Sequence, residues 1–409
     1  MRAPHSAPDG FLPVGAHYPT MRRRRLLAGL TAGIAGLAGC SGGSGGDRAT
    51  DERPTRSPTP QPVRQRLGDV DLPVPSGEIE YRLGKDDIPA IVDPVFADSW
   101  AGLSVPDSST YDGGPLLPDD SPVIGVERDG EARAYPLRIL DWHEVVNDDF
   151  GGPLLVTYCP LCGSGVTAER RVAGQETVFG VSGRLWRNDL VLYDRQTESL
   201  WSQLLAAAIR GPRAGERLTL VPSSLTTWGE WRDGHPDTRV LLPPPRSNTV
   251  RGPDATYDYF TSKYVRTDEQ LIGYAGAEGT PRPGQPAERR LVVGVTANGE
   301  ARAYPLDAVA ATGVVNDTVG DLPVVVTVTP GRSLVAYERR VDGTVLAFSP
   351  DGDAHMQAGG SRWERASGRA VDGPSQGRTL ARASDVPPMF WKGWRNFHPD
   401  TSVYGDGSG

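Results

Sequence analysis

The sequence predicts an α+β, strand-dominated protein whose two lobes arise from an internal duplication. Apolar residues fall in short runs bounded by Gly, Pro and Asp-Gly turns, a pattern typical of strands. One eight-residue block, Gly130–Leu137, recurs letter for letter as Gly299–Leu306, at an offset of 169 residues. Beyond its N-terminal segment the chain has about 340 residues, more than one domain usually holds, which favours two lobes.

The N-terminal segment predicts an export signal. Met21, which we take as the true start, is followed by four arginines, Leu26 and an apolar Gly/Ala-rich run too short to span a bilayer comfortably. The arginines before Leu-Leu resemble a twin-arginine signal, and the run ends in Leu-Ala-Gly-Cys, which resembles a lipobox with lipid on Cys40. We therefore assign residues 1–40 to a twin-arginine lipoprotein signal. An ordinary anchor helix is the alternative.

The next segment and the overall charge indicate where the protein resides and what it meets. Residues 41–66 are rich in Gly, Ser, Pro, Thr and charge, so we expect a disordered tether. A chain exported with lipid on Cys40 is extracytoplasmic and anchored to the cell membrane, whose surface is its first expected partner. The formal charge is −8, and only three of 43 basic residues are lysine, which argues against nucleic acid as a partner.

The duplication extends beyond the eight-residue block. Two further blocks recur in the same order: Val145–Asp148 as Val314–Asp317 at the same offset, and Trp228–Thr238 as Trp391–Thr401 at an offset of 163. Copy one therefore runs from about residue 122 to 242, and copy two from about 291 to 404. We assign residues 67–250 to lobe 1 and residues 251–409 to lobe 2.

Turn signals and periodicity predict the elements of copy one. Asp129-Gly130 indicates a hairpin between strands at 123–126 and 132–137, and Asn298-Gly299 takes the same place in copy two. The other expected elements are a short helix at 137–146, strands at 153–158, 166–172, 177–181 and 190–193, and a short helix at 224–232. We expect residues 132–137 and 301–306 to occupy equivalent positions in the two copies.

Two cysteines stand in one turn at the end of the expected strand 153–158. Between Cys159 and Cys162, Pro160 fixes φ, and Gly163 after them lets the backbone curl back. Once Cys40 is lipidated, these are the two thiols of the mature chain. They can bind one soft metal ion, cycle between dithiol and disulfide, or form a local structural disulfide. All three chemistries stay open at this point.

Copy two lacks this turn and a histidine together. Thr329 and Arg332 stand at the positions of the two cysteines, and Thr312 stands at the position of His143. The segment Phe179–Gly183 has only a degraded counterpart. Joint loss is expected if Cys159, Cys162 and His143 form one site. We expect a sulfur and an imidazole nitrogen of that site to lie about 3–4.5 Å apart, in a cleft of lobe 1.

Residues that both copies keep are interpreted differently. His235 and His398, with the tryptophans that precede them, occur in both copies. Packing and turns explain such shared residues most simply, so we interpret them as structural.

A metal at the cysteine turn needs more ligands. His143 is the leading third ligand, followed by Glu144, Asp194 or His235. Two thiolates and an imidazole suit zinc or copper and leave a position open for a substrate. A thioredoxin-like site is disfavoured, because Gly163 to Gly165 leads into a strand and not into the helix that would lower a thiol pKa.

Several motifs resemble the domain of unknown function 3179 family, from about Lys85 to the end of the chain. They are His143–Asp148, Tyr158–Gly163, Phe179–Gly183, Leu192–Thr197 and Ser199–Gln203. The resemblance implies no established activity, because the family has none. Some members look like selenoproteins at the cysteine motif, which implies reactive chalcogen chemistry there; this chain has plain cysteines.

Two function classes follow. The first is an exported, lipid-anchored protein that uses Cys159, Cys162 and His143 for metal binding or thiol redox chemistry, with a metal or a small molecule as its ligand. The second is a non-catalytic cell-envelope binding module in which the two cysteines are a structural disulfide. Whether the protein is an enzyme stays open.

Overall fold

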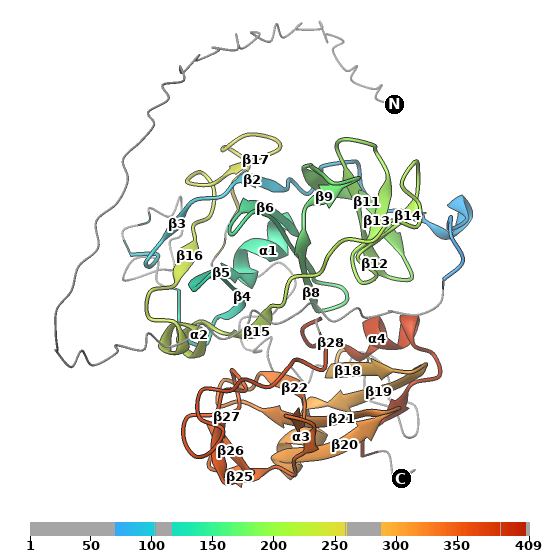
Figure 1. The fold of residues 1–409 in the computed structure, drawn as a ribbon. Helices are drawn as coiled ribbons and strands as arrows, with labels where there is room; N and C mark the ends of the chain where they lie inside the picture. Colours follow the sequence, from blue (N-terminus) through green and yellow to red (C-terminus); the bar gives the residue numbers. More distant parts are fainter. Residues whose placement is uncertain are drawn as a thin grey trace, which may run out of the picture. The chain divides into compact units, whose positions relative to one another are not determined.

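The structure is a computed structural model that describes residues 70–101, 103, 117–257, 259, 288–384 and 386–405 (Figure 1). All of these residues belong to one compact unit, Arg56–Gly409. The expected signal at 1–40 with Met21 and Cys40, and the expected tether at 41–66, lie outside the described residues. None of the helices within the described ranges is long and apolar enough to cross a membrane.

The prediction of two α+β lobes is wrong, whereas the predicted dominance of strand is confirmed. The described residues are 44% strand and 11% helix, and six small sheets are arranged as a six-bladed β-propeller. The α-helices of the described chain have seven residues each. A seven-residue helix is about 10 Å long, too short to build the helical layer of an α+β fold. Turn and strand signals predicted the strands but not how their sheets pack.

Three five-stranded sheets are built on copy one, and residues 80–97 and 248–249, which flank it, add strands to them. In the order of their hydrogen-bonded neighbours, the first comprises β15 (Ser224–Thr227), β4 (Pro122–Arg128), β5 (Glu131–Pro136), β16 (Arg239–Leu241) and β3 (Phe96–Ala97). The second comprises β17 (Asn248–Thr249), β2 (Ile91–Asp93), β6 (Val145–Asp149), β7 (Pro153–Cys159) and β8 (Ser164–Glu169). The third comprises β1 (Glu80–Tyr81), β11 (Phe179–Trp186), β12 (Asp189–Asp194), β13 (Leu200–Ser202) and β14 (Ala207–Arg210).

Copy two contributes the three corresponding sheets, with fewer strands. They comprise β28 (Met389–Phe390), β18 (Leu291–Ala297), β19 (Glu300–Pro305) and β29 (Ser402–Val403); β20 (Val314–Val319), β21 (Leu322–Val328) and β22 (Leu334–Glu338); and β25 (Ser349–Asp351), β26 (His355–Ala358) and β27 (Ser361–Glu364). Each copy also has a two-stranded ribbon: β9 (Arg171–Val172) with β10 (Gln175–Glu176), and β23 (Arg340–Val341) with β24 (Thr344–Val345). The helices are η1 (Ser76–Glu78), α1 (Leu137–His143), α2 (Trp228–Gly234), α3 (Leu306–Thr312) and α4 (Trp391–Phe397).

The equivalence predicted for residues 132–137 and 301–306 is confirmed. Strand β5 pairs antiparallel with β4 and parallel with β16, and β19 pairs in the same way with β18 and β29. Each of the two strands runs directly into a seven-residue helix, α1 or α3. The duplicated sequence therefore folds into a duplicated set of sheets.

The recurrent Val-Val-Asn-Asp block connects sheets within each copy. The Asn147 side chain donates to Phe179 O at 2.9 Å and accepts from Phe179 N at 2.7 Å, and Asn316 bonds Phe348 in the same way. The next residue, Asp148, accepts from Tyr135 Oη at 2.6 Å. The same contacts between segments recur in both copies, buried in copy one and part-buried in copy two, and they explain why both copies keep the block.

The recurrent Trp-His element is structural, as predicted. The Trp231 ring lies so close to β4 that a Cβ added at Gly125 would come within 2.3 Å of it, and Trp394 lies over Gly294 in the same way, at 2.1 Å. Each indole stacks on the following histidine, with centroids 3.9 Å apart for His235 and 4.0 Å for its counterpart in α4. Neither histidine therefore serves the cysteine turn.

Candidate dithiol site

The cysteine turn joins two paired strands. Strand β7 ends at Cys159, which lies opposite Ser164, the first residue of β8. Within the turn, Cys162 N donates to Cys159 O at 3.2 Å, and Gly163 has a φ of +58°. Pro160 donates no backbone hydrogen bond, and glycine takes a positive φ without strain, so the sequence favours this tight turn. The predicted buried strand that ends at the cysteines is confirmed.

The two thiols are free, buried and turned toward one backbone carbonyl. Cys159 is 2% exposed and Cys162 is fully buried. Cys162 Sγ donates to Asn188 O at 2.9 Å, and Cys159 Sγ lies 4.0 Å from the same oxygen. The pKa of Cys162 is raised well above its usual value, first by its hydrogen bond with Cys159 and then by burial. The Cys162 thiol therefore keeps its proton at neutral pH.

The carbonyl that faces the thiols comes from the hairpin between β11 and β12. Arg187 and Asn188 have φ of +52° and +64° and form the two-residue connection between the paired Trp186 and Asp189. A two-residue hairpin with positive φ at both positions is a type I′ turn, and Asn is among the residues it favours. The Arg-Asn pair between two apolar strands could have indicated this turn. No sequence signal placed its carbonyl at the cysteines.

A buried carboxyl group follows this turn, and our sequence analysis missed it. Asp189 has no exposed surface and accepts hydrogen bonds from Ser202 Oγ and from Leu204 N at 3.3 Å. Burial raises the pKa of Asp189 to about 8, although these hydrogen bonds act against the shift. Asp189 also contributes to the raised pKa of Cys162. The thiols therefore lie near a carboxyl group that is protonated at neutral pH.

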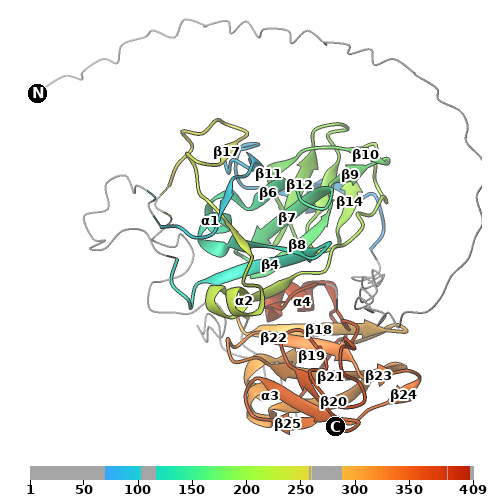
Figure 2. The same cartoon turned by 60° about the vertical axis from the view of Figure 1, so that its left-hand side comes forward.

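Copy two covers the cysteine turn. Strand β28 and helix α4 lie beside the turn that precedes β8 (Figure 1, Figure 2), and Phe390 N donates to Cys162 O at 2.8 Å. A Cβ added at Gly163 would come within 2.7 Å of the Phe390 ring, and one added at Gly393 would lie 3.3 Å from Cys162 Cβ. Sequence reasoning missed this cover because more than two hundred residues separate the two segments.

His143 bonds to groups other than the cysteines. Its Nδ1 lies 2.7 Å from Pro89 O and its Nε2 lies 2.8 Å from Tyr259 Oη. Since a carbonyl oxygen only accepts, Nδ1 carries the hydrogen of the contact with Pro89, and in the neutral ring Tyr259 donates to Nε2. Over the described ranges of the chain, no group of three or more His, Cys, Asp or Glu residues is placed to hold a metal ion. The role of His143 as a ligand stays a prediction, and these contacts do not support it.

The other candidate ligands are engaged elsewhere. Asp194 accepts from Thr197 N at 2.6 Å and from Trp201 Nε1 at 2.9 Å, so it organises the turn between β12 and β13. Glu144 ends α1 with a φ of +57°. His235 Nε2 lies 3.5 Å from a carboxylate oxygen of Glu127.

The matching turn of copy two is held by copy one. Thr329 Oγ1 donates to Glu230 Oε2 at 2.9 Å, and Gly331 N donates to Glu230 Oε1 at 3.2 Å, so the carboxylate of α2 closes this turn. The copies thus cover each other's turns, α2 over copy two and α4 over copy one. At the offset of 163 residues, Gly393 corresponds to Glu230 and Phe390 to Thr227.

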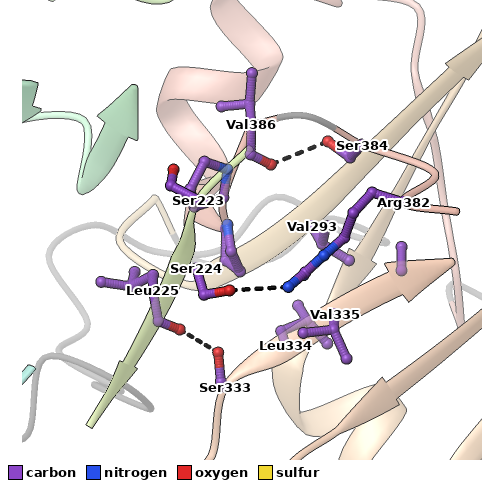
Figure 3. A pocket seen from close by; sticks show the side chains of 13 residues that line it. Ser223, Ser224, Leu225, Val293, Ser333, Leu334, Val335, Arg382, Ser384 and Val386 are labelled. Atoms are coloured by element: carbon purple, nitrogen blue, oxygen red, sulfur yellow. Dashed lines mark hydrogen bonds between the residues drawn. The ribbon is translucent and has the colours of Figure 1, made fainter. Parts of the chain in front are cut away.

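A small hollow lies between β15 of copy one and β22 of copy two (Figure 3). Arg382 extends across it and donates to Ser224 Oγ at 2.8 Å, and Ser333 Oγ donates to Leu225 O beside it. Neither cysteine lines this hollow. It is therefore not the cleft that the sequence predicted beside the thiols.

The comparisons with known proteins identify a family. The family model for proteins of unknown function called DUF3179 matches residues 85–401, which include both copies. The chain belongs to the DUF3179 family. This confirms the resemblance drawn from the sequence motifs. No curated protein and no solved structure matches the chain, so membership of DUF3179 carries no activity with it.

Proposed function

We propose that this DUF3179 protein carries out reversible dithiol–disulfide chemistry at Cys159 and Cys162, with a small hydroperoxide as the oxidant. The observation that carries the proposal is that two free thiols share one turn and one acceptor, Asn188 O. A turn closed by a hydrogen bond from residue i+3 to residue i keeps the two Cα atoms within about 7 Å, a separation that a disulfide can bridge.

The reaction proceeds in two balanced steps. The Cys159 thiol loses its proton, its sulfur attacks one peroxide oxygen, and the O–O bond breaks to leave a sulfenic acid. The departing alkoxide, or hydroxide from hydrogen peroxide, takes up the proton that the thiol released and leaves as an alcohol or as water. The sulfur of Cys162 then attacks the sulfenic sulfur, the S–S bond forms, and hydroxide leaves with the Cys162 proton as water. Two equivalents of an external thiol return the pair to the dithiol. The raised pKa of Cys162 supports this order, because it keeps the second thiol protonated until it is needed.

Burial supports a small oxidant. Both cysteines are almost fully buried, so the disulfide of another protein has no direct approach to either sulfur. We also propose that the protein is extracytoplasmic and lipid-anchored through Cys40, as the sequence motifs indicate. Export places the pair outside the reducing cytosol. On that side of the membrane a disulfide persists until a thiol reduces it.

Zinc or copper binding is the alternative use of the same sulfurs. The two thiols suit either metal, but His143, Asp194 and His235 have the other contacts described above. No group of three or more His, Cys, Asp or Glu in the described residues is placed to hold the ion, so it would need further ligands.

Thiol counting tests the proposal. The reduced protein, purified without chelator, is treated with one equivalent of hydrogen peroxide. We expect the loss of two thiols per chain, and a mass lower by two hydrogen atoms, both reversed by dithiothreitol. His143→Gln is the control and should behave like the parent protein. Unchanged thiols, together with a stoichiometric metal that Cys159→Ser and H143Q both lose, would replace redox chemistry with the metal site.

A further inference from the structure

The contacts that α4 makes with the cysteine turn differ in chemistry from those that α2 makes with the matching turn of copy two. Glu230 holds the turn of copy two through two hydrogen bonds from its carboxylate. At the corresponding positions over the cysteine turn stand Phe390 and Gly393, whose side chains have no polar group. The backbone contributes a hydrogen bond to this contact, from Phe390 N to Cys162 O. The cysteine turn is thus closed mainly by apolar packing.

The Phe390 ring is the bulky part of this cover. Phe390 is 2% exposed, and the close approach of its ring leaves no room for a side chain at Gly163, next to Cys162. Leu161, in the middle of the same turn, is 38% exposed, so the turn itself reaches the surface. The turn that carries the thiols therefore reaches solvent at Leu161 and packs against the second copy at Gly163.

We infer that Phe390 of copy two is the access-determining residue of the dithiol, admitting oxidants of the size of hydrogen peroxide and excluding bulky ones. The inference rests on the proposed function for its substrate class. It assigns copy two a part in the site although copy two has no cysteine itself. Gly393 contributes by leaving room for Cys162 beneath α4.

The access claim is tested without relying on redox chemistry. Native reduced protein is labelled with iodoacetamide, which is small, and with 5,5′-dithiobis(2-nitrobenzoate), which is bulky. Phe390→Ala should raise the rate with the bulky reagent about tenfold and the rate with iodoacetamide much less. Phe348→Ala is the matched control, because Phe348 is also buried in copy two but its backbone bonds Asn316 and not the cysteine turn. It should leave the ratio of the two rates unchanged.

Equal acceleration of both reagents in F390A and F348A would overturn the inference, because general unfolding would then explain access. If F390A fails to fold, Phe390→Leu takes its place and should change the ratio in the same direction by a smaller factor; an unchanged ratio overturns the inference. In the redox arm, F390A should lose the parent's preference for hydrogen peroxide over cumene hydroperoxide. A parent protein that no peroxide oxidises removes the proposed function, while the labelling ratio still decides the access claim.

Discussion

At the residue scale, the two cysteines are not interchangeable. Cys162 donates to Asn188 O at 2.9 Å, whereas Cys159 Sγ lies 4.0 Å from that oxygen. The hydrogen bond with Cys159 and burial raise the pKa of Cys162. A thiol that keeps its proton is a poor first nucleophile, because the thiolate is the reactive species. We therefore propose Cys159 as the attacking thiol and Cys162 as the resolving thiol.

This assignment predicts different products from the two single variants. Cys162→Ser should stop the reaction at a sulfenic acid on Cys159, since no resolving thiol remains. Cys159→Ser should give less sulfenic acid under the same peroxide, because burial still raises the pKa of the remaining Cys162 thiol after its cysteine partner is gone. Trapping with dimedone and mass spectrometry measures both products. Equal trapping in the two variants would contradict the asymmetry.

Asp189 predicts a pH dependence of stability. Its pKa is about 8 in the folded protein, because of burial, against about 4 for an aspartate in an unfolded chain. Between these values the unfolded chain binds fewer protons than the folded protein does. The free energy of unfolding therefore falls as pH rises through this window, and it levels off above the folded pKa. Asp189→Asn should remove this contribution, at most about 1.4 kcal/mol per pH unit. Urea unfolding of both proteins between about pH 5 and about pH 8 measures it; parallel pH profiles would contradict it.

At the element scale, the sequence patterns located most elements but misplaced their ends. The helix predicted at 137–146 ends at His143, because Glu144 takes a left-handed conformation. The helix predicted at 224–232 begins only at Trp228, where Thr227 accepts from Glu230 N as its N-cap; the residues before it form β15. Both errors concern the ends of helices. A single capping residue sets each end, and hydrophobic periodicity does not locate such a residue.

Helices α2 and α4 each pack a tryptophan against a glycine of the neighbouring sheet. Gly125→Ala and Gly294→Ala should each destabilise the protein by about 1–3 kcal/mol, because the added Cβ would meet the indole of Trp231 or Trp394. Gly234→Ala is the matched control at the end of α2, since a Cβ there meets nothing within 4 Å. Thermal or urea unfolding measures all three. A loss in G234A as large as in the other two would contradict this account.

At the scale of the whole molecule, the duplication organises both fold and site. Each copy supplies three sheets, and each covers the turn of the other, through Glu230 in one case and Phe390 in the other. The cysteine turn has four residues between the paired Cys159 and Ser164, whereas three residues separate Thr329 from its partner Ser333. The copies therefore differ in turn length as well as in side chains.

Anchoring is a property of the whole chain that the N-terminal motifs predict. Cys40→Ser should release the protein from membranes into the soluble extracytoplasmic fraction, because one lipid-modified residue supplies the anchor. Fractionation followed by immunodetection measures this, with Cys159→Ser as a control that stays membrane-bound. A C40S protein that remains with the membrane would contradict the lipobox assignment.

The sequence by itself determined the elements that local chemistry controls. The Asp-Gly hairpin, the strand that ends at Cys159 and the duplicated order of elements all follow from turn residues, apolar runs and repeated letters. The structural role of His235 and His398 also followed, because both copies keep them.

The tertiary structure alone decided which residues from distant parts of the chain lie in contact. It packed the sheets as a propeller, turned Asn188 O toward the thiols and buried Asp189. It also bonded His143 to Tyr259, and Phe390 N to Cys162 O. These contacts join residues between 26 and 228 positions apart in the chain. They depend on how sheets and copies pack against each other, and packing between distant segments leaves no periodic signal in a single sequence.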